Sequence, residues 1–573
     1  MVAMDSTRRA APHHELPPRA WRADLVAGLA ASAIVLPKAM AYATIAGLPI
    51  EVGLFTVLVP MLVYAALGSS RPLSVSTTTT LAILTGAALG SLGVAGDRAE
   101  LGAAAATLTL SVGALLCAAA LLRFGFLGNF ISAPVLVGFK SGIALVIVVD
   151  QLPKLLGLHV AKQGFFRDLF AIAQHLGEAH VPTLLLGGAL LAAIFALEHR
   201  APRLPIPLLA VAMAIGGAVL LRSLGAEVAM VGAVPMGLPQ LVAPKLVWIE
   251  ALWPAACGIA LMSFTESIAA ARAFAQSGEP RPAPNRELLA LGLANGVSAV
   301  FGAMPAGGGT SQTAVNRRAG ARSQLAGVTT ASVALAALLF LGPVIALLPQ
   351  TALAAIVIAY SVELIRPAEF RAILAVRTTE FAWALVALIG VVILGTLQGI
   401  VCAVLVSLFA LAHQAYHAPV YPLGRKRGTQ AFRPPSSEHP DDETWPGLLI
   451  LRLEGRLFFA NAPMLGEEMQ ELVEAERPSV LLLDASAIFD IEYTALEMLD
   501  AGERKLRERG IELWIAALNP SVRQVLQRTE LGRRLGRERL FFNVQQAVER
   551  YESHTAGERT RAEQAAVERP IAQ

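Results

Sequence analysis

Apolar runs long enough to cross a lipid bilayer recur along this chain from about Asp24 to about His417. A helix of roughly 20 apolar residues spans the ~30 Å hydrocarbon layer of a membrane. The clearest runs are Leu101–Leu122, Ser132–Val149, Pro182–Leu197, Pro205–Leu221, Leu325–Leu341, Phe381–Leu397 and Gly399–Ala412. Counting also the runs that Gly, Pro, Ser or Thr interrupt, we expect about 14 membrane segments.

The composition agrees with a membrane protein. Hydrophobic residues make up 55% of the 573 residues and charged residues only 16%. A soluble globular protein carries about 25% charged residues, so this chain has too few to cover a water-exposed surface. The composition therefore excludes a soluble enzyme, a disordered scaffold and a nucleic-acid-binding protein. Because neither metal-ligand spacing nor a nucleotide-binding or nucleophile-elbow motif occurs, we expect no enzyme, no cofactor and no metal.

Basic residues fall on one side of the predicted segments if the chain starts inside the cell. They follow alternate segments, for example at Arg123, Arg200, Arg317 and Arg425, whereas the intervening loops carry almost none. Positive charge marks the cytoplasmic side of a membrane protein. The N-terminal tail, residues 1–23, is polar and lacks the apolar core of a signal peptide. We therefore expect both termini in the cytoplasm, which requires an even number of segments.

The composition changes sharply after His417. We predict a transmembrane domain over 24–418, a polar, Pro-rich linker over 419–446, a small soluble α/β domain over 447–552 and a disordered tail over 553–573. The expected strands are Leu448–Leu453, Arg456–Asn461, Val480–Ala485 and Leu513–Leu518. The expected helices lie near Pro463–Glu474, Thr494–Arg509, Ser521–Arg528 and Val544–Tyr551.

Two polar breaks interrupt membrane segments at corresponding places in the two halves of the chain. The first contains Ser74, Ser76 and Thr77–Thr80, and the second contains Gly307–Gly309 and Thr310–Thr313. Non-helical backbone inside a membrane is tolerated only where protein or water satisfies it. A helix that begins at such a break points free N–H groups and its positive dipole end toward it. The paired breaks indicate an anion-binding site of a transporter, unless the hydroxyls only pack helices together.

Charged residues inside the predicted segments are costly and usually functional. Lys38 and Glu266 occupy the first segments of the two halves, so an inverted repeat would bring both toward one cavity. In one interpretation Lys38 attracts the anion and Glu266 binds a coupling proton; in the other they form a permanent structural ion pair. For Lys140 and Glu363 we expect an ion pair near the gate, or side chains that extend toward the membrane surface.

At these residues the chain resembles the SulP family of sulfate permeases, the bacterial and plant relatives of solute carrier family 26. The resemblance extends from about Asp24 to Tyr551. The matching stretches are DLVAGL from Asp24, PKAMAYATIAGLP from Pro37, GLFTVLVPMLVYAALGSSRPLSV from Gly53 and FGAMPAGGGTSQTAVNRRAGAR from Phe301. GRLFFAN and LLLDASAIFDIEYTALEML in the soluble part are similar to a STAS domain.

This resemblance implies an all-α membrane domain with an inverted repeat of seven plus seven segments, followed by an α/β STAS domain. It implies a core domain that moves against a gate domain in an elevator-like cycle, in a homodimer in the bacterial inner (plasma) membrane. The substrate is expected between the third and tenth segments. The matching substrate-binding positions are Lys38, Tyr42, Ser76, Thr77, Thr78, Thr79, Thr310, Ser311, Gln312 and Thr313, and Glu266 matches the position linked to the coupling ion.

The chain departs from the family pattern at the predicted site. The family usually has Gln at the position of Lys38, Gly-Pro at Ser76 and Thr77, and Arg at Gln312. A positive charge has thus moved from the tenth segment to the first. If Lys38 contacts Glu266, its ammonium replaces a sodium ion there, which favours proton coupling or exchange over sodium symport.

A hydroxyl in the STAS-like part is a candidate for regulation. DIEYTAL, which begins at Asp490, matches the loop where related anti-sigma-factor antagonists carry a phosphorylated Ser or Thr, and Thr494 is the matching residue. The alternative is that Thr494 only caps the helix that begins there. A cytoplasmic partner of this domain is also expected.

The leading hypothesis is therefore secondary active transport of a small inorganic or organic anion, with sulfate as the first expectation. Bicarbonate and dicarboxylates, with proton or sodium coupling, are alternatives, because a site of dipoles and hydroxyls recognises charge and size more than identity. Two other classes are an anion channel on the same scaffold and a membrane sensor whose output is the STAS-like domain.

Overall fold

The structure is a computed structural model that describes residues 20–567, apart from 94–96, 130–131, 159, 161–163, 202–203, 233 and 277–278. Most of the N-terminal tail expected over 1–23 lies outside the described residues. The chain divides into two compact units, Met1–Leu408 and Phe409–Gln573. We describe each unit by itself.

The membrane helices form two successive series of seven, which confirms the predicted helical membrane domain. Nine described helices are long and apolar enough to cross a membrane, and three shorter ones are apolar as well. The first series is α1 (Ala20–Ile45), α2 (Ile50–Leu67), α3 (Thr79–Gly90), α4 (Arg98–Leu121), α5 (Ala133–Leu156), α7 (Val181–Arg200) and α8 (Ile206–Ser223). The second is α9 (Ile249–Ala273), α10 (Pro284–Val300), α11 (Thr310–Arg318), α12 (Leu325–Phe340), α14 (Gln350–Val362), α16 (Thr378–Leu394) and α17 (Thr396–Tyr416).

The two series share an internal landmark. In each, the third helix is short, and a strand of two residues precedes it. These strands are β1 (Val75–Ser76) before α3 and β2 (Gly307–Gly308) before α11. The polar breaks in the sequence therefore become extended backbone followed by half-length helices, as predicted.

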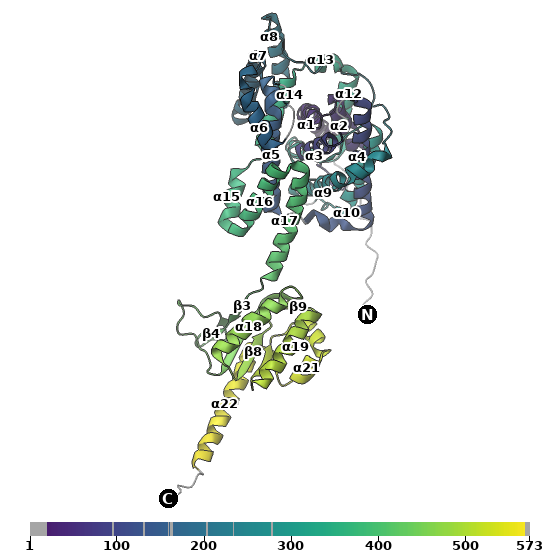
Figure 1. Cartoon of the computed structure of the whole chain (residues 1–573). Coiled ribbons are helices and arrows are strands. Elements are labelled where there is room, and N and C mark those ends of the chain that lie inside the picture. The colour runs from purple at the N-terminus through teal and green to yellow at the C-terminus, as the bar shows by residue number, and fades with distance from the viewer. Residues whose placement is uncertain are drawn as a thin grey trace. The chain divides into compact units, whose positions relative to one another are not determined.

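The helices sort into two packed groups (Figure 1). The core bundle consists of α1–α4 and α9–α12, in which α4 packs on α10, α1 on α12, and α2 on both α10 and α12. The gate bundle consists of α5, α7, α8, α14 and α16, in which α5 packs on α14 and α16. The first part of α17 joins it, since Cys402 lies close to Gly390 of α16. The two groups meet where α1 contacts α8 and α14, and where α3 contacts α5.

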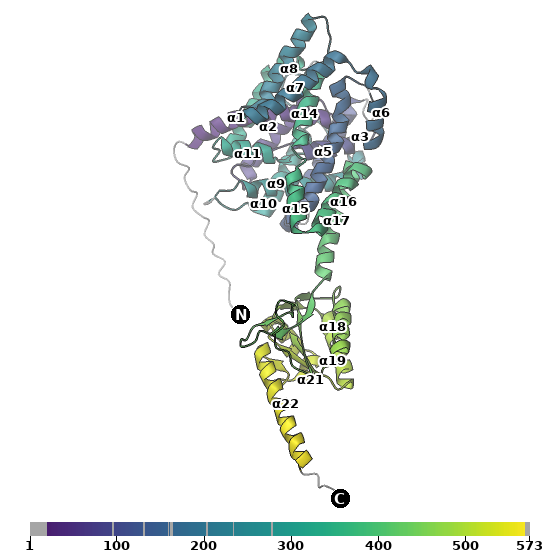
Figure 2. The same cartoon turned by 90° about the vertical axis from the view of Figure 1, so that its left-hand side faces the viewer.

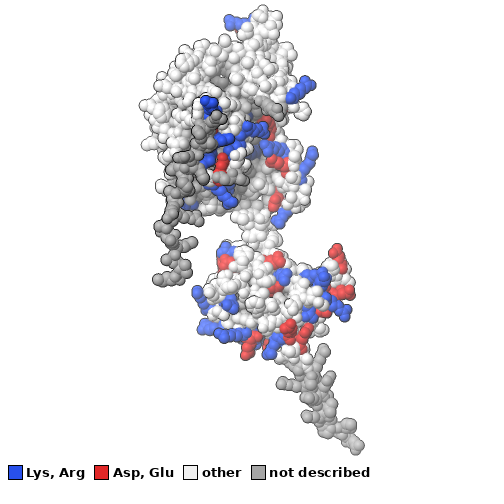
Figure 3. All heavy atoms as spheres, turned by 180° about the vertical axis from the view of Figure 1, so that it is seen from behind, with Lys and Arg blue, Asp and Glu red and all other residues white. Residues whose placement is uncertain are grey.

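The surface of the first unit suits a lipid environment. Large apolar side chains such as Phe340, Leu185 and Leu121 are exposed there, and broad areas carry no charge (Figure 3). The second unit carries Lys, Arg, Asp and Glu over the face shown. This contrast is what a membrane domain and a water-exposed domain on one chain require.

The second unit is built on a five-stranded sheet in the order β11-β10-β8-β6-β3. Its central strands, β6 (Leu448–Leu453), β8 (Val480–Asp484) and β10 (Glu512–Ala516), are parallel, and β3 (Val420–Pro422) is antiparallel to β6. Both faces are covered, so the strands read as nearly continuous apolar runs. On β6, Leu449, Leu451 and Leu453 face one core, while Leu448 and Ile450 face another.

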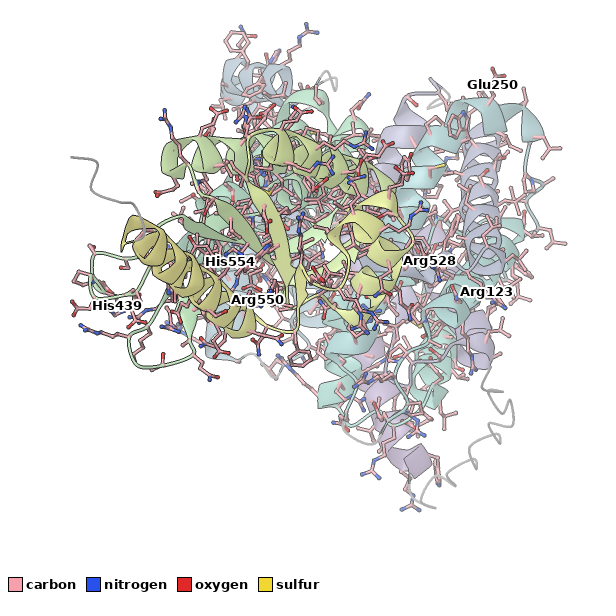
Figure 4. The ribbon with its side chains drawn as sticks, turned by 90° about the horizontal axis from the view of Figure 1, so that it is seen from below. Arg123, Glu250, His439, Arg528, Arg550 and His554 are labelled. Atoms are coloured by element: carbon pink, nitrogen blue, oxygen red, sulfur yellow. The ribbon has the colours of Figure 1, made fainter. Side chains whose placement is uncertain are left out.

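Helices cover the two faces of this sheet. The helices α18 (Ala462–Glu476), α19 (Tyr493–Glu508), α20 (Pro520–Gln527) and α21 (Glu530–Leu535) contribute to the first core, and α22 (Val544–Val567) contributes to the second. Figure 4 shows Arg550 and His554 on α22. The remaining strands are β4 (Gly424–Arg425), β5 (Phe432–Arg433), β7 (Gly455–Leu457), β9 (Ile488–Ile491) and β11 (Leu540–Phe541).

The structure differs from the sequence predictions at both ends of this unit. The segment 419–446, expected as a linker, contains β3, which joins the sheet as an edge strand; an edge position tolerates its Pro422. The tail, expected to be disordered from residue 553, instead continues α22 as far as Val567. A polar helix can extend a packed one, because Val544, Val548 and Tyr551 anchor its first turns.

The contact between α4 and α10 predicts a sharp difference between two glycines of α4. A Cβ added at Gly113 would lie 2.6 Å from the backbone nitrogen of Gly296 and 2.8 Å from the carbonyl oxygen of Gly292, whereas one at Gly102 would meet nothing within 4 Å. We expect Gly113→Ala to lower the free energy of unfolding by about 1–3 kcal/mol through overpacking. Gly102→Ala is expected to leave it unchanged or to raise it by up to ~1 kcal/mol.

The melting temperatures of the two purified variants in detergent, each compared with the wild type, measure this difference. Equal melting temperatures for the two variants would contradict the close approach of α4 and α10.

Candidate functional site

The two polar breaks meet in the interior of the core bundle. β1 and β2 pair antiparallel, with Val75 opposite Gly308 and Ser76 opposite Gly307. The Gly309 N–H donates to the carbonyl of Ser74 at 3.1 Å and extends the pairing. Since these strands are buried, each satisfies the backbone of the other away from water. The pairing places the beginnings of α3 and α11 next to each other.

Gln312, in the first turn of α11, bridges the two breaks. Its Oε1 accepts a hydrogen bond from the Ser76 hydroxyl at 2.7 Å, and its Nε2 donates to the Thr77 carbonyl at 3.3 Å. Beside it, the Thr313 hydroxyl accepts from the Ser74 N–H at 3.2 Å and donates to the Gly309 carbonyl at 2.7 Å. These polar groups are almost fully buried, so the junction satisfies itself and is held in one arrangement.

The N-terminal tips of the two half-helices differ in whether a side chain caps them. At α3, the N-cap residue Thr78 accepts a hydrogen bond from the Leu81 N–H at 3.3 Å. At α11, the N-cap residue is Gly309, and no side chain caps the helix. Thr310 and Ser311, which open α11, are both exposed. The tip of α11 is thus the open one, and its dipole and hydroxyls are available to an anion.

Glu266 of α9 lies against the tip of α3. Its carboxylate accepts hydrogen bonds from the Thr78 hydroxyl at 3.0 Å and the Thr80 hydroxyl at 3.0 Å. The ammonium of Lys140, on α5, lies 3.4 Å from Oε1 of Glu266. Only 7% of the Glu266 side chain is exposed. The core bundle therefore holds this carboxylate with two hydroxyls, and the gate bundle neutralises it with a lysine.

Lys38 does not contact Glu266, so the hypothesis of an ion pair between them is wrong. Its ammonium lies 3.4 Å from the centre of the Tyr360 ring on α14, and the carboxylates that attract it are those of Glu363 and Glu198. The physical reason is that α1 packs on α14 and α8, whereas the Glu266 carboxylate is turned toward α3 and α5. Lys38 is 4% exposed and is held by charge and ring contacts with the gate bundle.

Tyr42, the other predicted residue of α1, does join the site. Its hydroxyl accepts a hydrogen bond from the Thr79 hydroxyl at 2.9 Å. Of the residues predicted for the membrane site, Lys38 is thus the one that the structure places elsewhere. The sequence analysis put Thr80 in the first break but not among the substrate-binding positions, and it expected Lys140 near the gate rather than against Glu266. The signals were present, since Thr80 ends the run of four threonines and Lys140 is a single charge within an apolar run.

The far end of α11 is anchored as firmly as its tip. The Arg317 guanidinium donates to the carbonyls of Phe274 at 2.9 Å and Ala321 at 3.2 Å, and it pairs with Glu279. Partial burial alone would raise the pKa of Glu279, but Arg317 and the Gln276 N–H outweigh it and lower that pKa. Because α11 also packs on α1 and α9 (Figure 2), it is a fixed half-helix.

The regulatory candidate Thr494 lies in the first turn of α19, and its side chain is exposed. It is not the N-cap residue, because Glu492 holds that place without a side-chain cap, so the capping alternative is wrong. Nearby, Arg456 forms ion pairs with Asp490 at 3.0 Å and with Glu492 at 2.6 Å. The hydroxyl is therefore accessible, and a guanidinium lies close to the same turn.

Comparison with known proteins agrees with this geometry. A family profile described as "Sulfate permease family" matches residues 21–387, and a STAS domain profile matches residues 439–547. The chain is 34% identical over 539 residues to a "Probable sulfate transporter" of Mycobacterium tuberculosis, covering 93% of this chain and 96% of the relative. It is 30% identical over 550 residues to the chloroplastic sulfate transporter 4.1 of Arabidopsis thaliana, covering 92% and 80%.

Solved structures show the same fold. The murine solute carrier 26 family member A9 anion transporter in its inward-facing state superposes with a TM-score of 0.84 at 20% identity, covering 94% of this chain and 92% of that one. The transmembrane domain of a cyanobacterium bicarbonate transporter superposes with a TM-score of 0.60 at 24% identity, covering 68% and 98%.

The bridging role of Gln312 predicts a loss of stability. In Gln312→Leu, the buried Ser76 hydroxyl and Thr77 carbonyl lose their partner. Each such loss costs about 1–3 kcal/mol. We expect a lower melting temperature for the purified full-length protein in detergent. Thr310→Ala is the matched control, because it changes an exposed side chain of the same helix and is expected to leave the melting temperature unaltered. Equal melting temperatures for both variants would show that the bridge does not stabilise the junction.

Proposed function

The chain belongs to the sulfate permease family and carries a STAS domain, and on that premise we propose that it is a secondary transporter that moves sulfate together with a proton. The observation that carries this proposal is the pairing of β1 with β2, which places two half-helix tips side by side. One tip is open and lined by hydroxyls, and the other holds a buried carboxylate. The proposed anion site and the proposed proton site thus lie next to each other.

The open tip of α11 supplies the proposed contacts to the anion. The hydroxyls of Thr310 and Ser311 and the first N–H groups of α11 offer donors to an oxyanion, and the helix dipole favours its charge. Gln312 and Thr313 position this tip against Ser76 and Thr77. Thr78, Thr79 and Tyr42 complete the proposed set from α3 and α1, whereas Lys38 is left out of it because its ammonium lies against Tyr360 of the gate bundle.

Glu266 is the proposed site of the coupling proton. It is buried, it is within reach of two hydroxyl donors, and a lysine from the other bundle balances its charge. Because the Lys140 ammonium already supplies the positive charge that a bound sodium ion would supply, the geometry favours a proton over sodium.

Movement of the core bundle against the gate bundle is the proposed transport step. Both charged contacts described above, Lys38 with Tyr360 and Lys140 with Glu266, cross from one bundle to the other. An elevator-like displacement would break both contacts and re-form them. From membership of the family we propose a homodimer in the bacterial inner membrane. From the positively charged loops we propose that both termini lie in the cytoplasm.

Uptake into proteoliposomes of the purified full-length protein tests the substrate and the class of function. We expect labelled sulfate to accumulate under an imposed proton gradient and to saturate with concentration. If bicarbonate or a dicarboxylate accumulates and sulfate does not, the substrate is that anion and not sulfate. If uptake depends on a sodium gradient, the coupling ion is sodium and not a proton. Large, non-saturating anion currents would indicate a channel. No transport of any of these anions, together with an altered signalling output, would indicate a sensor.

In the same assay, Glu266→Gln is expected to abolish the pH dependence of uptake. A single coupling proton limits the change in rate to about tenfold per pH unit, and the variant is expected to give a flat profile. Glu250→Gln is the matched control, since Glu250 lies on the same helix, at its exposed N-terminal end (Figure 4). An unchanged profile in Glu266→Gln would remove this residue as the coupling group.

Thr494 is the proposed regulatory residue of the STAS domain. A phosphate on this hydroxyl would lie at a helix N-terminus and would compete with Asp490 and Glu492 for Arg456. We expect Thr494→Asp to change the maximal uptake rate without changing the KM for sulfate, and Thr494→Ala to change neither. Ser521→Asp is the control, because Ser521 is an exposed hydroxyl in the first turn of α20. Identical rates for Thr494→Asp and Ser521→Asp would argue against regulation at Thr494.

A further inference from the structure

Charged side chains of the core bundle interact with residues of the gate bundle. Glu266 of the core pairs with Lys140 of the gate. The ammonium of Lys38 of the core lies against the Tyr360 ring of the gate and is attracted by the gate carboxylates of Glu198 and Glu363. A charge within a membrane is costly unless it is paired. Each bundle therefore depends on the other to neutralise one of its own buried charges.

Lys140 reaches the tip of α3 through Glu266. Three other basic side chains of the unit have partners elsewhere, since Arg317 binds Glu279, the Arg286 side chain donates to the Leu67 carbonyl, and Lys245 pairs with Glu100. Lys38 is 4% exposed beneath Tyr360. Lys140 has 26% of its side chain exposed, and among the described residues the carboxylate that pairs with its ammonium is that of Glu266, at 3.4 Å.

A continuous chain of contacts links Lys140 to the open tip. Lys140 contacts Glu266, which accepts from Thr78, the N-cap residue of α3. The adjoining Thr77 carbonyl accepts from Gln312 in the first turn of α11. A carboxylate and an oxyanion such as sulfate present the same kind of charged oxygen to an ammonium. Glu266 therefore occupies on Lys140 the place that a transported anion could take.

We propose that Lys140 binds the transported anion and that Glu266 and the anion use its ammonium in alternation. While Glu266 is ionised, it holds Lys140. When a proton from the aqueous phase binds the Glu266 carboxylate, the carboxylate loses its charge and releases the ammonium to the anion. One proton and one anion are then held together, and both leave when Glu266 ionises again. This inference rests on the proposed function and adds that the gate bundle, not the core, supplies the cation.

Among the described residues, two titratable groups lie near Glu266. Lys140 approaches it from α5, and Tyr42 of α1 lies near it through Thr79. From α3 the hydroxyls of Thr78 and Thr80 donate hydrogen bonds to it.

Three carboxylate or guanidinium groups on the other helices packed on α9 are engaged away from this site. On α10, Glu287 accepts from Tyr64 and Ser69, on α11 Arg317 pairs with Glu279, and on α4 Glu100 pairs with Lys245. The exchange of partners at Lys140 therefore depends on the protonation of Glu266.

The competing interpretation is that the ion pair only fastens the gate to the core. In that case, Lys140→Gln and Glu266→Gln both remove the same fastening, and both change anion affinity in the same direction. Alternation predicts that the two variants change anion affinity in opposite directions, because Glu266→Gln frees the ammonium for the anion whereas Lys140→Gln removes the ammonium. The sign of the two effects therefore separates the interpretations.

The experiment measures the Kd of labelled sulfate for the purified full-length protein at acidic and at alkaline pH. We expect the wild type to bind more tightly at acidic pH and Glu266→Gln to bind tightly at both. Lys140→Gln is expected to bind about tenfold more weakly at acidic pH, as loss of one charge-assisted hydrogen bond would give, and to lose most of the pH dependence. The double variant is expected to match Lys140→Gln, and Lys140→Arg is expected to retain binding.

Lys154→Gln is the matched control, because Lys154 lies in the last turn of the same helix, and its Kd is expected to equal that of the wild type. The melting temperature of every variant verifies folding. Effects of the same sign in Lys140→Gln and Glu266→Gln, or an unchanged Kd in Lys140→Gln, would overturn this inference while leaving the proposed function intact. Failure of the wild type to bind or transport sulfate would instead overturn the proposed function, and the inference with it.

Discussion

The rest of the structure depends on one constraint, which is that backbone inside a membrane must find its hydrogen-bond partners within the protein. An extended strand cannot form backbone hydrogen bonds within itself, so β1 and β2 each serve as the partner of the other. Gln312 then forms hydrogen bonds with the Ser76 hydroxyl and the Thr77 carbonyl of the junction. Because the two breaks can exist only together, two half-helices begin at one place, and their dipoles favour negative charge there. The proposed anion site is thus a consequence of how the membrane domain satisfies its own backbone.

A second constraint acts on the charges. Glu266 and Lys38 belong to the core bundle, yet their partners belong to the gate bundle. A relative movement of the bundles separates charges that are costly to leave unpaired in a membrane. In the proposed mechanism, the proton and the anion remove this cost, because a protonated Glu266 needs no cation and Lys140 meets the anion instead. Binding and movement are then coupled through the same few atoms.

Much of the architecture was accessible from the sequence. Long apolar runs predicted the membrane helices, alternation of strands and helices predicted the soluble domain, and the family resemblance is confirmed. The paired breaks also predicted that Thr77 and Gln312 lie close together, as they do. The partner of Glu266 was predicted wrongly, and Thr80, although placed in the first break, was left out of the predicted site residues. Repeat symmetry relates α1 to α9 but does not say which way each side chain points, and rotation of a helix by one residue changes the neighbour it meets.

The sequence by itself determined where helices cross the membrane and where they are interrupted, because hydropathy and the need for hydrogen-bonded backbone act locally along the chain. It also determined that some charges must be buried. Only the tertiary structure decided which of those charges meet. The placement of Lys140 against Glu266, and of Lys38 against Tyr360, follows from how two bundles pack across an interface between segments far apart in the chain. Electrostatic pairing depends on distances of a few ångströms in space, which no spacing along a sequence specifies.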